Sequence, residues 1–242
     1  MRLYKYFSGL IFFILFFQNI FSNPQLDLID TPTAATLPRG AFNITMLGYE
    51  QGGILNKTAV GLHDNIFLGV SFDIEHVIGR DKVKFNIPGV LARIKITDSI
   101  QDIPVLISFG YDSFYPESYQ QINPDFTVNS RLIYGPYLVI TKPLFTGTLE
   151  HHLHIGVRLP VQPYYQPDES SMFIGYDLPL GQFVPMMEVE KILFNQYRLN
   201  EYRFNTGIRF NLYDSLALEI NFMLTGKKET NRVVNFEYAG SF

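Results

Sequence analysis

Large apolar side chains recur at every second position along most of this chain. The pattern is clearest at residues 66–75, where Ile66, Leu68, Val70, Phe72 and Ile74 alternate mainly with glycine and polar residues. Successive side chains of a β-strand point to opposite faces, so the alternation predicts strands with one apolar and one polar face. After the N-terminal region there is no apolar run of about 18 residues, the length of a membrane-spanning helix. We therefore expect an all-β protein.

Twelve such segments follow residue 40, and turn-forming residues separate them. An even number of strands is typical of bacterial single-chain membrane barrels, as are short turns on one side and long loops on the other. Connections after even-numbered segments are short here, for example at 63–65 and 143–147, while most others are longer and polar, above all the loop at 113–130. The sequence predicts an antiparallel up-and-down transmembrane β-barrel of about 12 strands over residues 41–242. Pro179 and Pro185 make the strands near 171–191 the least regular.

The first residues carry the features of an export signal. Arg2 and Lys5 precede an apolar run at 10–17, and the small residue Ser22 follows. A basic start, a short apolar core and a small residue at the end describe a secretory signal peptide, so we predict one over residues 1–22. Residues 23–40 contain prolines and a glycine and predict an arm rather than a strand, which we expect to lie in the periplasm. The chain has no cysteine and so no disulfide.

The distribution of charge supports a barrel. Removal of Arg2 and Lys5 with the signal leaves 17 basic against 23 acidic residues, a net charge of −6, which argues against a nucleic-acid partner. A charge that faces lipid at mid-bilayer costs roughly 2–4 kcal/mol, so the charged positions of the strands should face the lumen. The candidate lumen-lining residues are Arg93, Lys95, Glu150, His152, His154, Arg158, Glu188, Glu190, Arg203, Arg209 and Glu219. Both signs are mixed, so we expect no strong ion selectivity, and the opposite charges could also pair and plug a narrow interior.

One group of these residues invites a search for catalysis. Glu150, His152 and His154 share the inward face of one strand, and histidine with carboxylate is a common metal-binding or acid–base combination. A third ligand cannot be placed, and polar residues of a lumen explain the spacing equally well. We also find no Gly-x-Ser-x-Gly motif, no phosphate-binding loop and no paired-acid protease motif. We expect no catalysis, no metal site and no cofactor.

The two ends of the predicted mature chain resemble known bacterial proteins. The last residues, NFEYAGSF, place Phe236, Tyr238 and Phe242 on one face. This ending resembles the C-terminal assembly signal of bacterial outer-membrane barrels, which implies residence in outer-membrane lipid and recognition by the barrel-assembly machinery. Residues 29–42, IDTPTAATLPRGAF, resemble the start of a YjbH-like group of predicted barrels, which implies an association with exopolysaccharide export.

Three hypotheses for the function follow from these observations. The first is an outer-membrane barrel that passes or binds small solutes, as a porin does, or serves structurally without catalysis. The second is a barrel that assists export of exopolysaccharide or other envelope material with partner proteins. The third is a soluble exported β-sandwich. The sequence identifies no substrate and no oligomeric state.

Overall fold

The computed structural model describes residues 24–49, 52–86, 88–100, 103–113, 135–159, 170–194, 202–225 and 230–242. The predicted signal peptide at 1–22 lies outside these residues, as does nearly all of the loop predicted at 113–130. No helix among the described residues is long and apolar enough to cross a membrane.

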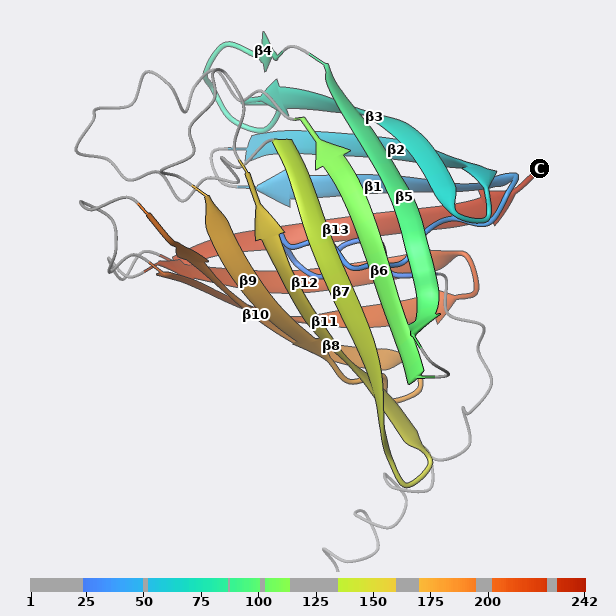
Figure 1. The fold of residues 1–242 in the computed structure, drawn as a ribbon. Coiled ribbons are helices and arrows are strands. Elements are labelled where there is room, and N and C mark those ends of the chain that lie inside the picture. The colour runs from blue at the N-terminus through green and yellow to red at the C-terminus, as the bar shows by residue number, and fades with distance from the viewer. Residues whose placement is uncertain are drawn as a thin grey trace, which may run out of the picture.

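A single antiparallel sheet closes on itself to form a barrel (Figure 1). Its strands are β1 (Ala41–Tyr49), β2 (Gly53–His63), β3 (Ile66–Glu75), β4 (Lys84–Phe85), β5 (Gly89–Ile100), β6 (Ile103–Asp112), β7 (Gly135–Thr146), β8 (Leu149–Arg158), β9 (Ser171–Asp177), β10 (Phe183–Ile192), β11 (Tyr202–Tyr213), β12 (Leu216–Thr225) and β13 (Thr230–Ser241). The short β4 pairs only with the end of β3, and the other 12 strands make the barrel wall. The predicted fold class is confirmed.

The barrel closes at both sequence ends of the strand series. β13 pairs with β1 over eight residue positions, from Ala41 opposite Ser241 to Gly48 opposite Val234. Phe42 on β1 packs near Tyr238 and Phe242, with ring centroids 5.9 and 5.3 Å apart. The aromatic residues at the C-terminus thus lie at the seam between the first and last strands.

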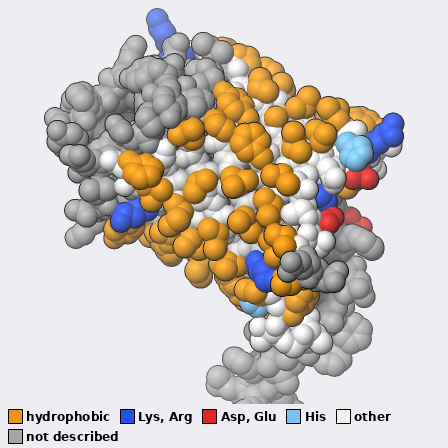
Figure 2. Space-filling model, viewed as in Figure 1, with side chains coloured by type: hydrophobic (Ala, Val, Ile, Leu, Met, Phe, Trp, Pro, Cys, Tyr) orange, Lys and Arg blue, Asp and Glu red, His pale blue; other side chains and the backbone are white. Residues whose placement is uncertain are grey.

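The faces of the wall follow the predicted alternation. On β3, Leu68, Val70 and Phe72 are 41–48% exposed, while Ser71 and Asp73 between them are at most 2% exposed. Figure 2 shows hydrophobic side chains covering most of the visible outer surface of the described residues. Backbone groups in lipid must be paired internally, and a closed barrel pairs them along every strand. The apolar outside and polar inside therefore fit a barrel that spans a membrane.

The N-terminal arm, described over residues 24–40, was expected in the periplasm, and in the structure it is seated in the barrel lumen. It runs inside the barrel, between the near and far strands in Figure 1. Its backbone and side chains contact residues from several parts of the wall, including Lys57 on β2, Thr141 on β7 and Glu188 on β10. The arm's position has a physical cause. Charged groups line the lumen of this barrel and need partners, and the arm supplies some of these partners.

Candidate functional site

The lumen is the candidate functional site, and the arm fills its apolar parts. Ala34 packs against Tyr137, Val139 and Phe173 and is fully buried. Two further clusters join arm residues to wall residues: Leu28 and Ile29 with Leu47, Leu55, Val184, Met186, Met223 and Val233, and Leu37 with Ala59, Phe67 and Leu91. Burying each of the large arm residues contributes about 1.5–3 kcal/mol relative to an exposed side chain, so apolar contacts help to hold the arm in the lumen.

Glu188 on β10 fixes the turn of the arm. Its carboxylate accepts hydrogen bonds from three consecutive backbone N–H groups, those of Ile29, Asp30 and Thr31, at 2.9–3.2 Å. The hydroxyl of Thr31 donates a further bond at 2.7 Å, and the amide of Asn205 donates one at 2.6 Å. Glu188 is 1% exposed. A buried carboxylate needs such donors, and here the arm provides most of them.

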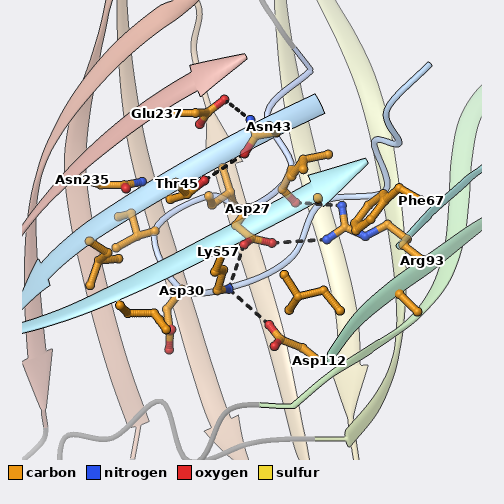
Figure 3. A pocket seen from close by; sticks show the side chains of 18 of the residues that line it. Asp27, Asp30, Asn43, Thr45, Lys57, Phe67, Arg93, Asp112, Asn235 and Glu237 are labelled. Atoms are coloured by element: carbon orange, nitrogen blue, oxygen red, sulfur yellow. Dashed lines mark hydrogen bonds and ion pairs between the residues drawn. The ribbon is translucent and has the colours of Figure 1, made fainter. Parts of the chain in front are cut away.

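Arg93 on β5 also holds the arm (Figure 3). Its guanidinium donates to the backbone carbonyls of Leu26 and Ala35 at 2.9 and 2.8 Å and to the Asp27 carboxylate at 3.2 Å. From the wall, the Tyr137 hydroxyl accepts a bond at 2.7 Å. The arginine is 2% exposed, and three of its four hydrogen bonds therefore depend on the arm.

The Asp27 carboxylate of the arm bridges two cations. One oxygen lies 3.2 Å from Arg93 Nη2, and the other lies 3.2 Å from Lys57 Nζ, which also contacts Asp112. Burial raises the pKa of the Asp27 carboxyl, but Lys57 and Arg93 outweigh this effect and hold the pKa below its ordinary value. The pairing stabilises the seated arm at pH values above the ordinary carboxyl pKa. This stabilisation is lost as the pH falls through the lowered pKa of Asp27.

Charges near the other wall strands pair mainly with one another. Arg158 on β8 donates to the Asp30 carbonyl of the arm and lies 3.5 Å from Glu190, which is also 3.6 Å from Arg203. Arg209 on β11 lies 3.1 Å from Glu219 and 2.8 Å from Glu237. Most of these ion pairs join the same or nearby strands of the wall, so the opposite charges pair along the wall.

The histidines predicted as a possible chemical group lie in a hydrogen-bonded chain. His152 Nδ1 is 2.9 Å and His154 Nε2 is 2.6 Å from the two oxygens of Asp177, which comes from the neighbouring β9. Glu150 lies 3.3 Å from His152, and Thr141 lies 2.8 Å from His154. Among the described residues, no three groups converge in a way that could hold a metal ion. This series of hydrogen bonds ends at the arm, because Ala34 N donates to the Thr141 hydroxyl at 2.9 Å.

Lys95 is less involved in the interior than predicted. Its ammonium lies 3.8 Å from Asp98, which is 71% exposed, near the turn between β5 and β6. The other predicted lumen residues each contact a charged partner or the arm, although the Glu150 side chain is 53% exposed. The partners that the arm contributes, chiefly Asp27 and Thr31, were not predicted.

A small cavity is left beside the arm. It has a volume of about 50 Å³, lies along Asp27 and is lined by polar residues such as Asn43, Thr45 and Asn235 (Figure 3). A buried water needs roughly 10–15 Å³ of such space, so the cavity holds only a few waters. This cavity is too small for a sugar-sized solute.

Two glycines of the wall leave room for the arm. A β-carbon at Gly175 would lie 2.2 Å from the Leu28 side chain, and one at Gly61 would lie 2.0 Å from the Pro38 carbonyl oxygen. At Gly61 the obstacle is backbone, which cannot rotate away. The wall and the arm are therefore complementary in shape.

Gly61→Ala is expected to loosen the arm where it enters the barrel. Overpacking typically costs 1–3 kcal/mol, so the population with a released arm should rise about tenfold. The measurement is the rate at which a maleimide labels a cysteine at position 33 (Thr33→Cys), which is 2% exposed in the seated arm and unique in a chain without cysteine. Gly48→Ala is the control, because its β-carbon would meet nothing closer than 3.8 Å. Equal rates in both variants would contradict the expected clash.

The fold has relatives among solved structures. No protein-family model and no curated protein matches this chain. A KdgM porin is 12% identical, with a TM-score of 0.54 over 84% of this chain and 99% of the porin. A KdgM porin in complex with disordered oligogalacturonate is 11% identical, with a TM-score of 0.52 over the same shares. At this level of identity the likeness concerns the fold: the chain has the barrel fold of outer-membrane porins.

Proposed function

We propose that this protein is an outer-membrane, porin-like channel for small solutes whose pathway is closed by its own N-terminal arm. One observation carries the proposal: a closed barrel, apolar outside and charged inside, has a non-strand segment of its own chain seated in its lumen. A charged wall is what a polar solute would meet if the arm left.

Features at both ends of the chain support the outer-membrane location. The predicted signal peptide at 1–22 would direct export, and the C-terminal Phe236, Tyr238 and Phe242 would be read by the barrel-assembly machinery. The three aromatic side chains are 51%, 47% and 90% exposed, so they are accessible on the outer surface of the last strand. Outer-membrane lipid would then cover them.

A reversible lock on the arm tests the proposal with the whole chain. Thr141 Oγ1 lies 2.9 Å from Ala34 N, so the variant carrying Ala34→Cys and Thr141→Cys brings two thiols close enough for a disulfide. We expect the refolded variant in a planar lipid bilayer to show no conductance steps when oxidised and discrete steps after reduction. Ala34→Cys alone is the control and should not respond to oxidant.

The other outcomes separate the remaining hypotheses. Steps of equal size and frequency in both states would show that the arm does not close the pathway. A folded barrel that stays silent in both states would contradict the channel and favour a structural role, or the second candidate, a barrel that assists exopolysaccharide export with partners. The latter has some support, because the residues that resemble the YjbH-like group, 29–42, include most of the segment that fills the lumen. Failure to insert would favour a soluble exported protein.

A further inference from the structure

The arm occupies the donors of one particular arginine. Arg93 is held by the wall through its Nε, which donates to the Tyr137 hydroxyl, and its guanidinium lies 5.0 and 5.5 Å from the ring centroids of Phe67 and Tyr137. Its two terminal nitrogens donate only to the arm among the described residues. When the arm leaves, the guanidinium keeps its support and loses its acceptors.

A second cation contacts the Asp27 carboxylate. Lys57 on β2 and Arg93 on β5 each contact a different oxygen of the Asp27 carboxylate, both at 3.2 Å. Two cations that each contact one oxygen of the same carboxylate form a geometry that recognises this group, and the planar guanidinium adds direction to the contact. The two cations belong to the rigid wall, whereas the carboxylate belongs to the arm.

The surroundings of this point suit a small polar molecule. The cavity beside Asp27 is lined by Asn43, Thr45 and Asn235, which can donate and accept hydrogen bonds (Figure 3). The rings of Phe67 and Tyr137 add apolar contact on the side of Arg93. Removing the arm would widen this cavity by the volume of the residues next to Asp27.

We propose that Arg93 and Lys57 form a binding site for a small solute bearing a carboxylate, and that Asp27 of the arm occupies this site until such a solute displaces it. The inference rests on the proposed function, since it names the class of solute that the channel would admit. Because the arm and the solute compete for the same cations, a carboxylate should shift the equilibrium toward the released arm. A solute that binds only the released state multiplies the ratio of released to seated arm by a factor. This factor is one plus the solute concentration divided by the dissociation constant.

The test measures arm release and needs no conductance. The full predicted mature chain carrying Thr33→Cys is refolded, and its maleimide labelling rate is measured with succinate, with uncharged succinamide or with sulfate at equal ionic strength. When the arm reseats faster than it is labelled, the rate follows the released population. We expect succinate at ten times its dissociation constant to raise the rate about tenfold. Succinamide and sulfate should leave the rate within about twofold.

Wall variants identify the site. In the Thr33→Cys background, Arg93→Lys keeps the charge but removes the planar fork, and Lys57→Gln removes the second cation; each should abolish most of the succinate response. Arg203→Gln is the matched control and should keep the response, because the ion pair of Arg203, to Glu190 at 3.6 Å, joins two wall strands. Heat-modifiable gel migration confirms that each variant is folded, and either wall variant suffices if the other fails to fold.

Several results would overturn the inference. These are no acceleration by succinate, equal acceleration by succinamide or sulfate, or an unchanged response in Arg93→Lys and Lys57→Gln. The disulfide experiment on the proposed function is independent of all of them. Conductance that depends on the lock, without a succinate response, would refute the site and keep the channel. A succinate response in a silent barrel would keep the site and refute the channel.

Discussion

Replacing Glu188 with glutamine is expected to release the arm from the lumen. The glutamate carboxylate accepts four hydrogen bonds from the arm, three from backbone N–H groups and one from the Thr31 hydroxyl. Glutamine has a single acceptor oxygen and turns its NH₂ group toward donors on the other side. Hydrogen bonds to a charged group contribute about 1.5–3 kcal/mol each, and buried donors left unpaired add to the loss.

The expected effect is large because all four hydrogen bonds end on one side chain, so a single substitution weakens them together. We expect a loss of about 3 kcal/mol for the seated arm, which corresponds to a released population roughly 100 times larger. The maleimide labelling rate at position 33 measures this population directly. In a planar bilayer, the Glu188→Gln chain should also open more often than the unaltered protein.

Glu219→Gln is the matched control for this prediction. Glu219 is equally buried, at 1% exposure, but its partners are Arg209, Asn221 and Asn235 on the wall and none lies on the arm. In the Glu219→Gln variant, the labelling rate at position 33 should stay close to that of the parent chain as long as the barrel is folded. If both variants label at the same rate, Glu188 does not hold the arm.

The wall of the barrel could be predicted from the sequence because its constraint is local. Each residue of a strand faces either lipid or lumen, so alternation at Leu68, Val70, Ser71 and Asp73 is enough to assign both faces. Closure of the last strand on the first also followed, since a barrel leaves no free edge. The two-residue β4 was missed because such a short bridge leaves no alternation to detect.

The arm could be recognised as non-strand, but its place could not be predicted. Pro32, Pro38 and Gly40 exclude a regular strand without saying where the segment lies. Its main contacts are backbone N–H and C=O groups bound to Glu188 and Arg93, and every sequence offers such groups.

The histidine chain shows a second limit of sequence patterns. His152 and His154 were predicted on one inward face, but their shared partner Asp177 was not assigned to them. The partner is set by the register of β8 and β9, in which His152 lies opposite Asp177. A long loop joins these strands, so no tight turn fixes the register and the pairing could not be derived from spacing.

The largest loss of barrel stability is expected from Arg209→Met. This arginine is 2% exposed and binds two carboxylates, Glu219 at 3.1 Å and Glu237 at 2.8 Å, which are themselves 1% and 6% exposed. Removing it leaves two buried charges next to each other without a cation. Breaking a buried ion pair in this way typically costs 3–5 kcal/mol, and we expect a loss of about that size in the free energy of unfolding, measured by urea titration of heat-modifiable migration.

Two further variants separate a buried network from charge in general. Adding Glu219→Gln and Glu237→Gln to Arg209→Met removes the uncompensated carboxylates and should recover most of the loss. Lys95→Met removes a cation from a pair whose aspartate is 71% exposed and should cost less than about 1 kcal/mol. Unaltered stability in Arg209→Met would contradict the network. Arg209→Met could reduce stability without faster labelling at position 33 under conditions where the barrel stays folded. This result would show that the lumen holds two separate sets of charges. One set, around Arg209, would stabilise the wall, and the other, around Glu188 and Arg93, would bind the arm.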